Sequence, residues 1–203
     1  MSAGGSALVP DQPVFRRTVA EGIELKLFEP ADAEAIYAAA NRDRAYLRRW
    51  LPWVERTHSP ADVRHFIVGT VIPQWTDGRG PECGIWIEGV FSGGVGCHPI
   101  DWLNRSCSLG YWIASQHQGR GIITRCCSTL IGYLFDDLHL HRVVIQCGTE
   151  NYRSCAVPQR LGFTREGVAR GAEWVNDRWV DLVTWSLLEQ EWRNRDVTRY
   201  PQP

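Results

Sequence analysis

Residues 106–134 constrain the fold more than any other segment, because one periodicity gives way to another within them. Leu109, Tyr111 and Ile113 alternate with other residues, which is the pattern of a strand. A turn with two glycines follows at 118–121, and the next apolar residues are spaced as on one face of a helix. That stripe consists of Ile123, Cys126, Cys127, Leu130, Ile131 and Leu134. The order predicts a helix packed on a sheet, with both cysteines of the stripe in the core.

The other segments complete a mixed α/β or α+β sheet and not a strict alternation of parallel strands and helices. Strands are expected at 22–28, in three segments within 83–113, and at 142–147, 163–170 and 174–188. Helices are expected to begin near Pro30, Ser59, Gly121 and Asn151, and Pro73 is expected to end the second of them. We interpret 14–192 as one domain between tails at 1–13 and 193–203.

Composition excludes several classes of partner. The 203 residues carry a net charge of −1, which is unlike a chain that binds nucleic acid through phosphate contacts. The only lysine, Lys26, has no glycine-rich setting, so phosphate-loop chemistry is excluded. No apolar run approaches the roughly 18 residues that span a bilayer. Seven cysteines without a C-x-x-C pair indicate a reduced, cytoplasmic protein that has neither disulfides nor a metal site.

The segment 118–124 is the most informative for chemistry. Gly119 and Gly121 allow the backbone to bend tightly and to approach a ligand closely. The first N–H groups of the following helix are free, and its dipole favours an anion such as a diphosphate. Arg120 adds a positive charge. The dinucleotide fingerprint fails, because Thr124 stands where its third glycine would be.

This bend resembles the acyl-CoA signature of the GCN5-related N-acetyltransferases (GNAT), written Q/R-x-x-G-x-G/A. Gln118, Gly121 and Ile123 take its three fixed places. Ile123 departs from the Gly or Ala of the signature, and a bulkier residue there is familiar in the RimL/RimJ-like branch, which acetylates the N-termini of ribosomal proteins.

Two further segments are similar to the same branch. Residues 151–167 match its pattern N-x-x-S-x-x-(aliphatic)-x-x-x-L-G-F-x-x-E-G, and residues 50–53 (WLPW) resemble its aromatic segment near the acceptor pocket. The resemblance covers most of residues 22–192. It implies a single-domain GNAT fold, in which a mixed, mostly antiparallel sheet is splayed in the middle and flanked by helices.

The resemblance also implies where acetyl-CoA, the co-substrate, lies. Its pantetheine would run between the strands that end near Ile113 and Cys147, and its pyrophosphate would rest on the backbone amides of the bend. The implied coenzyme-binding residues are Trp112, Ile113, Ala114, Gln118, Gly119, Arg120, Gly121, Ile122, Ile123, Thr124 and Asn151.

The implied reaction is acyl transfer from a thioester to a neutral amine. An α-amine is roughly one-tenth neutral at pH 7, whereas a lysine side chain is neutral only about once in 2,500, so an α-amine needs only a weak base. By resemblance Glu173 is that base, acting through water, and Ser154 donates to the departing sulfur. The alternatives are a solvated surface role for Glu173, a helix-turn role for Ser154, and Asp181 as the base or as a structural group.

Pro158 lies inside the helix that follows Asn151. Its ring clashes with the carbonyl four residues earlier, that of Ser154. We therefore expect a kink that frees polar groups beside the thioester.

The chain is thus predicted to be an N-acetyltransferase that uses acetyl-CoA and acts on a primary amine, either a protein N-terminus or a small amine. A succinyl-type acyltransferase and a non-catalytic acyl-CoA-binding scaffold are the alternatives. Trp50 and Trp53, beside two arginines, are expected to bind the acceptor or to form a homodimer contact. Acyl-CoA and the amine are the expected partners, without nucleic acid, membrane or metal.

Overall fold

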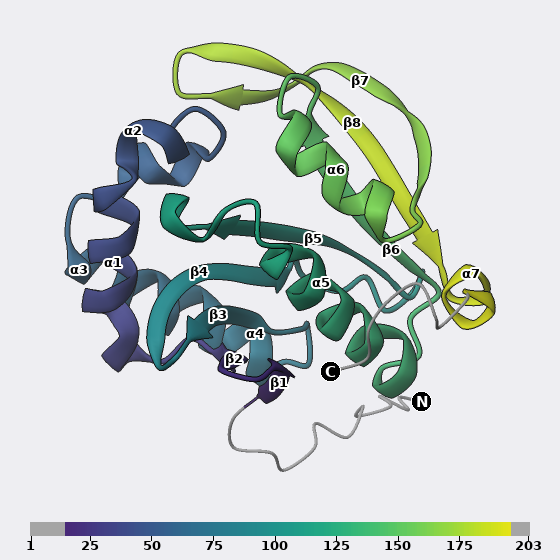
Figure 1. Cartoon of the computed structure of the whole chain (residues 1–203), viewed down its shortest axis with the longest axis horizontal. Helices are drawn as coiled ribbons and strands as arrows, with labels where there is room; N and C mark the ends of the chain where they lie inside the picture. The colour runs from purple at the N-terminus through teal and green to yellow at the C-terminus, as the bar shows by residue number, and fades with distance from the viewer. Residues whose placement is uncertain (1–14, 196–203) are drawn as a thin grey trace, which may run out of the picture.

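The structure, a computed structural model, describes residues 15–195. It contains one eight-stranded sheet with helices packed on it (Figure 1). The strands are β1 (Arg16–Ala20), β2 (Ile23–Leu27), β3 (Glu82–Ile87), β4 (Val90–Cys97), β5 (Ser106–Ile113), β6 (Arg142–Gly148), β7 (Thr164–Val175) and β8 (Arg178–Leu188). The α-helices are α1 (Ala33–Arg42), α2 (Arg44–Leu47), α3 (Pro60–Phe66), α4 (Ile72–Thr76), α5 (Ile122–Gly132), α6 (Tyr152–Arg160) and α7 (Glu189–Asn194). Short 3₁₀ turns are η1 (Pro30–Asp32), η2 (Pro52–Arg56) and η4 (Ser115–His117), and π-helical turns are η3 (Ile67–Val71) and η5 (Tyr133–Asp137).

The sheet order is β1-β2-β3-β4-β5-β6-β8-β7, and only β5 and β6 run parallel. Their pairing extends from Ser106↔Arg142 to Leu109↔Ile145 and then stops. Beyond that point β5 stays paired with β4, and β6 stays paired with β8. The sheet therefore parts in its middle, which confirms the predicted splayed, mostly antiparallel α+β fold.

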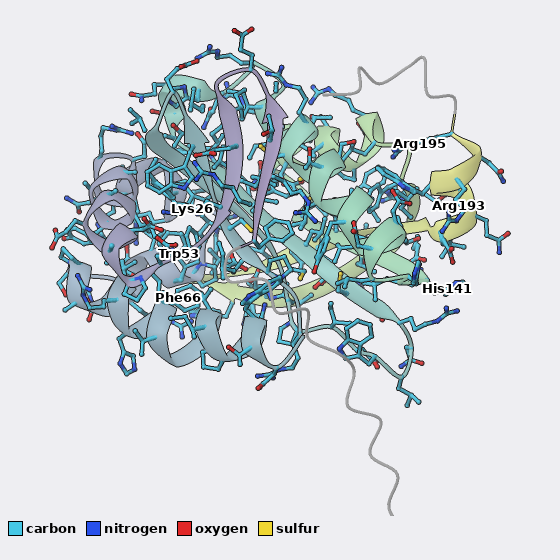
Figure 2. The ribbon with its side chains drawn as sticks, turned by 90° about the horizontal axis from the view of Figure 1, so that it is seen from below. Lys26, Trp53, Phe66, His141, Arg193 and Arg195 are labelled. Carbon is cyan, nitrogen blue, oxygen red and sulfur yellow. The ribbon has the colours of Figure 1, made fainter. Side chains whose placement is uncertain are left out.

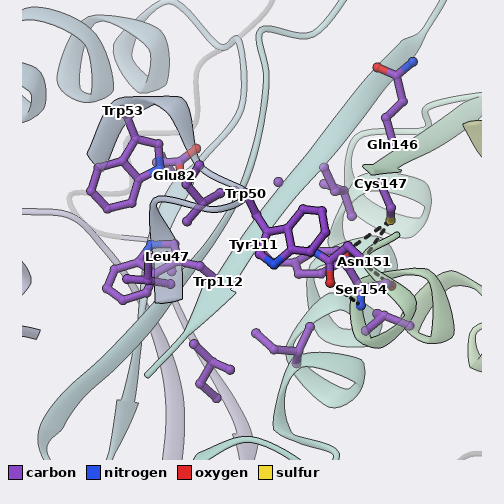
Figure 3. Close-up of a pocket in the computed structure, with 18 of the residues that line it drawn as sticks. Leu47, Trp50, Trp53, Glu82, Tyr111, Trp112, Gln146, Cys147, Asn151 and Ser154 are labelled. Atoms are coloured by element: carbon purple, nitrogen blue, oxygen red, sulfur yellow. Dashed lines mark hydrogen bonds between the residues drawn. The ribbon is translucent and has the colours of Figure 1, made fainter. Parts of the chain in front are cut away.

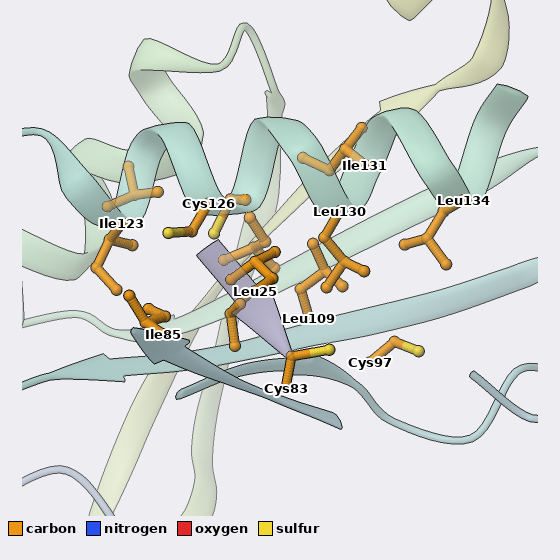
Figure 4. Packing of buried hydrophobic residues seen from close by; sticks show 14 of the residues in the cluster. Leu25, Cys83, Ile85, Cys97, Leu109, Ile123, Cys126, Leu130, Ile131 and Leu134 are labelled. Carbon is orange, nitrogen blue, oxygen red and sulfur yellow. The ribbon is translucent and has the colours of Figure 1, made fainter. Parts of the chain in front are cut away.

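Helix α5 packs its apolar stripe on one face of the sheet. Figure 4 shows Ile123, Cys126 and Leu130 of this helix facing Leu25 and Ile85 of the strands. Cys126 and its neighbour in the stripe are fully buried, and all seven cysteines of the chain are buried free thiols. This confirms that the two stripe cysteines belong to the core.

The helix that begins at Ser59 does not end at Pro73 as predicted. It continues through the π-helical turn η3 into α4, with the N–H of Ile72 bonded to the carbonyl of Ile67. The π turn shifts the hydrogen bonding by one residue. Pro73 then sits in the first turn of α4, where its missing N–H costs least.

The two ends of the sheet also differ from the predicted strands. β1 was not predicted, because its short, arginine-containing sequence shows little apolar alternation. The break predicted near 171–173 is a bulge inside β7, and the turn to β8 lies at residues 176–177. Glu173 is therefore a strand residue opposite Val180.

The predicted tail 1–13 lies outside the described residues, and of 193–203 only 193–195 are described. α7 extends through Asn194, and the bounds 14–192 stay a prediction. Figure 2 shows Phe66 of α3 and Arg193 of α7 at opposite ends of the molecule. Among the described helices, none has the length and apolarity that crossing a membrane requires.

A bidentate ion pair ties three strands of the outer half of the sheet together. The Nη1 and Nη2 atoms of Arg142 on β6 each lie 2.6 Å from an oxygen of Glu166 on β7. Ser186 on β8 donates its hydroxyl to the same carboxylate at 2.9 Å. The hydrogen bonds from Arg142, followed by that from Ser186, lower the pKa of Glu166 to about 2.

We predict that Glu166→Gln lowers the free energy of unfolding at pH 7 by about 1 kcal/mol, because the pair is partly exposed and screened by solvent. The folded-state pKa of Glu166 is depressed, so its contribution is present above pH ~4.3 and is lost as pH falls toward 2. Urea unfolding of both proteins between pH 2 and 7 measures this difference. The exposed Glu21→Gln is the control, and a difference that is independent of pH would contradict the assignment.

Candidate active site

The gap between β5 and β6 exposes backbone groups of β5. The N–H of Ala114 donates to the carbonyl of Ser92 beside β5, at 2.8 Å. Because backbone groups alternate sides along a strand, those of Trp112 also point to β4, whereas those of Tyr111 and Ile113 point into the gap. Of the predicted pantetheine partners, Ile113 therefore has backbone groups that face the gap, as does Tyr111, whereas those of Trp112 and Ala114 are used on the β4 side. The pantetheine contacts themselves stay a prediction.

A cavity of about 1350 Å³ surrounds this gap. Its walls are the N-terminal helices on one side and β6, β8 and α6 on the other. Figure 3 shows Trp53 and Glu82 on one side of it, and Cys147, Asn151 and Ser154 on the other. Every residue predicted for the site lines the cavity except Ala114, which is fully buried.

The bend before α5 has the geometry that the sequence predicted. Gly119 and Gly121 both have φ of 72°, a conformation that strains other residues. Gly121 is the N-cap of α5 and offers no side chain, so the first N–H groups of the helix, from Ile122 to Thr124, have no capping group. The bend therefore presents free donors at the positive end of a helix.

Basic side chains surround the bend. Arg153 donates to the Oε1 of Gln118 at 2.6 Å, and Arg120 lies 3.3 Å from a ring nitrogen of His117. Burial, followed by the charges of Arg120 and Arg42, lowers the pKa of His117. The positive surroundings favour a bound diphosphate. The Nε2 of Gln118 is buried without a partner among the described residues.

Asn151 and Ser154 form the first turn of α6. Asn151 is the N-cap, and its Oδ1 accepts the N–H of Ser154 at 3.2 Å. The predicted helix-turn role for this pair is therefore present. The side-chain amide of Asn151 donates to no described residue and faces the cavity.

The hydroxyl of Ser154 has a second set of contacts. It lies 3.2 Å from the hydroxyl of Tyr111 and 3.2 Å from the Sγ of Cys147. Burial raises the pKa of Cys147 to about 11 and the pKa of Tyr111 well above its usual value. Both groups are therefore protonated at neutral pH. Three weak proton donors meet where β5 and β6 part.

Pro158 frees a backbone carbonyl, as predicted, whereas the predicted kink beside the thioester stays a prediction. It stands inside α6, so the carbonyl of Ser154 four residues earlier lacks an intrahelical partner. The hydroxyl of Tyr111 donates to this carbonyl at 3.0 Å. Pro158 thus frees the acceptor that holds Tyr111 in the cluster.

Glu173 faces the cavity from β7. Burial raises its pKa, and the nearby His98 lowers it to a smaller extent. Asp181 has a structural partner instead, since its Oδ1 accepts the N–H of Gly171 in the bulge of β7 at 2.7 Å. Of the two carboxylates considered as the base, only Glu173 lines the cavity.

Trp50 and Trp53 both line the cavity beside α2 and η2. The guanidinium groups of Arg49 and Arg178 stack over the ring of Trp50, 4.9 and 5.4 Å from its centre. Trp53 packs against Trp112 with the ring centres 5.8 Å apart. The aromatic segment therefore forms the wall opposite α6.

Tyr111, His98 and Glu82 are among the site residues that were not predicted as functional. Tyr111 was interpreted only as part of a strand face, although Pro158 signals a free carbonyl that needs a donor. His98 and Glu82 reach the cavity through the sheet register, which no local motif reports.

This arrangement can bind an anionic coenzyme at one end and place a thioester beside proton donors at the other. Comparison with known proteins identifies the family, because the "Acetyltransferase (GNAT) domain" family matches residues 23–164. The chain is a GNAT N-acetyltransferase. It is of the RimL/RimJ type. The chain is 39% identical over 179 residues to YdaF of Bacillus subtilis, a putative ribosomal N-acetyltransferase, and the match covers 88% of this chain and 98% of YdaF.

Two further proteins resemble this acetyltransferase over most of its length. The ribosomal-protein-serine acetyltransferase of Escherichia coli is 30% identical over 170 residues, which is 84% of this chain and 94% of that protein. The structure of Mycobacterium smegmatis RimJ in complex with a coenzyme A disulfide matches with a TM-score of 0.80 at 26% identity, covering 87% of each chain. Homologues of the acetyltransferase thus bind coenzyme A.

Proposed function

We propose that this acetyltransferase transfers the acetyl group of acetyl-CoA to the α-amine at the N-terminus of a protein. The observation that carries the proposal is the gap between β5 and β6, which has an anion-binding bend at one end and a cluster of proton donors at its apex. A relative 30% identical to this chain is named for acetylating a ribosomal-protein serine, which supports a protein N-terminus as the acceptor.

The coenzyme would lie on the α5 and α6 side of the gap. Its diphosphate would accept N–H groups of Gly121 and the residues after it, with Arg120 and Arg153 nearby. Its pantetheine would bond to the gap-facing backbone of Ile113 and to the free amide of Asn151. The thioester would then reach the apex, where the backbone of Tyr111 is available to its carbonyl oxygen.

Ser154 and Glu173 divide the acid and base work. The departing thiolate needs only a hydrogen bond or a single proton, because a thiol has a pKa near 8.5. Ser154, which contacts Tyr111 and Cys147, supplies this hydrogen bond or proton to the sulfur. Glu173, directly or through water, takes the proton that nitrogen sheds as the N–C bond forms.

The test is a thiol-release assay with acetyl-CoA and peptides that carry the N-termini of ribosomal proteins, compared with the same peptides blocked at the α-amine and with polyamines. We expect release only with free α-amines, and mass spectrometry should locate one acetyl group on the N-terminus. Release with polyamines alone, or with no amine at all, would contradict the proposal.

Gly121→Ala is predicted to weaken binding of acetyl-CoA about tenfold. A side chain at φ of 72° costs about 1–2 kcal/mol, so the bend relaxes and its N–H groups leave the coenzyme. Gly162→Ala is the matched control, because Gly162 has φ of 79°, equally open space and no place in the cavity. Isothermal titration should show a weaker Kd for the first variant only; equal loss in both would point to general destabilisation.

Ser154→Ala and Glu173→Gln are predicted to lower kcat by about 10²-fold while leaving the Kd of acetyl-CoA within twofold. The pKa of Glu173 is raised, and a base acts only when ionised, so wild-type kcat should fall as pH drops through that pKa. This fall of kcat at low pH should be absent in Glu173→Gln and retained in Ser154→Ala. If the pH dependence of kcat disappeared in both variants, it would belong to another group.

A further inference from the structure

Glu82, the first residue of β3, is a carboxylate without a partner. It lines the cavity, yet its oxygens accept no hydrogen bond and form no ion pair with any of residues 15–195. Burial raises the pKa of Glu82 to about 8. A carboxyl group held in this way in a ligand cavity is suited to meeting a cation that arrives with the ligand.

The sheet register points Glu82 toward the apex of the gap. Glu82 on β3 is paired with Gly96 on β4, and Gly96 is paired with Gly110 on β5. Gly110 comes directly after Leu109, where the pairing of β5 with β6 ends. A row of positions across three strands therefore starts at Glu82 and ends at the point where the thioester is proposed to lie.

The glycines leave this row open. The Oε2 of Glu82 lies over β4, since a Cβ placed on Gly96 would come within 2.1 Å of it. Neighbouring strands are about 5 Å apart, so the carboxylate is roughly one strand spacing from Gly110. A Cβ on Gly110 would meet only the Nε2 of His98, at 3.7 Å.

Glu82 and Ser154 face the apex from opposite sides of the sheet. Side chains alternate along a strand, so Gly110 and Trp112 share the face of Glu82, whereas Tyr111, the partner of Ser154, lies on the face of α5. The leaving sulfur and the incoming amine therefore have separate approaches, one through the donors and one past the carboxylates.

We propose that Glu82 is a catalytic residue that receives the acceptor as an ammonium ion and removes its first proton. The inference rests on the proposed function and concerns the same cavity. Nitrogen must shed two protons between ammonium and amide. Glu82 takes the first, the neutral amine attacks the thioester carbon, and the second passes to Glu173 as the N–C bond forms and the C–S bond breaks. The sulfur takes up one proton through Ser154, so one proton per turnover is released to solvent.

Two ionisable groups near Glu82 have partners of their own. Lys26 on β2 shares its face of the sheet, but its charge is bound by Glu29 and Asp32. Asp62 of α3 caps its own helix. Tyr46 on α2, Arg56 on η2, His98 after β4 and Glu173 on β7 also line the cavity.

The proton affinities of the two partners are matched. An α-amine has a pKa of about 7.7–8.0, and the pKa of Glu82 is raised to about 8. Once paired, they hold one proton between them, and the forms with the proton on oxygen or on nitrogen are close in free energy. A useful fraction of the bound acceptor is then a neutral amine.

The decisive variant is Glu82→Gln, with the exposed Glu88→Gln as the control. At pH 7 about a tenth of an α-amine is neutral and, with a pKa of about 8, about a tenth of Glu82 is ionised, so a deficit in Glu82→Gln comes from the lost attraction between the carboxylate and the ammonium ion. We expect this loss to lower kcat/KM for a peptide acceptor about tenfold at pH 7. The deficit should shrink to less than twofold at pH 9, where the amine is neutral without help. The Kd of acetyl-CoA should not change, which shows that the variant is folded.

Hydroxylamine, which is neutral at pH 7, separates the two carboxylates. We expect Glu82→Gln to match wild type with this acceptor, whereas Glu173→Gln should remain slow with both acceptors. Gly110→Ala provides a second test of the acceptor's approach, because the added methyl group fits the structure but fills the space before the gap. It should lower kcat/KM for the peptide and leave coenzyme binding unchanged.

Proton release gives a readout that does not need turnover. Titration of the peptide into the complex with coenzyme A, in buffers of different ionisation enthalpy at pH 7, should release close to one proton with wild type and almost none with Glu82→Gln. A wild type that releases this proton but transfers no acetyl group refutes the proposed function and retains the Glu82 site. Active wild type with an unimpaired Glu82→Gln, or with a deficit equal at pH 7 and pH 9, overturns the inference.

Discussion

The pairing of β5 with β6 stops at Leu109 and Ile145, and the chemistry proposed for this protein depends on that interruption. Each strand continues for several residues with a partner on its other side, so both halves of the sheet remain stable without the missing ladder. The cost of the gap is a short stretch of unpaired backbone, at Tyr111 and Ile113 on the β5 side. A ligand that can form sheet-like hydrogen bonds satisfies those groups, which makes the sheet itself a binding site.

The gap opens on both faces of the sheet, and the two faces have different chemistry. The α5 and α6 face carries the helix N-terminus, arginines and the cluster of Ser154, Tyr111 and Cys147, all of which suit an anionic coenzyme and a leaving thiolate. The other face carries Glu82 and Glu173, which suit a cationic amine. In the proposed reaction, opposite charge preference on the two faces would bring the two substrates to one carbon atom without bringing their charged groups together.

The sequence predicts well what local patterns encode. The apolar stripe of α5, the glycine bend and the Asn151 cap are each set by residues a few positions apart, and the structure contains them as predicted. Pro73 was misjudged because a π turn lets the helix continue past it, and the break near 171–173 was misjudged because Asp181 stabilises a bulge there. Both compensations depend on partners or hydrogen-bond shifts that residue type alone does not reveal.

The candidate site also contains residues that local motifs predicted and residues that only the fold reveals. Ser154 and the bend were found through motifs, whereas Glu82 and Tyr111 become site residues only through strand register and through the carbonyl freed by Pro158. Register also places Gly96 and Gly110 in one row with Glu82, where a side chain at either position would lie between Glu82 and the gap. In most strands a glycine weakens the packing of the sheet. Here the absent side chains deepen the cavity, and the half-buried carboxylate of Glu82 lies on the side from which the acceptor amine is proposed to approach.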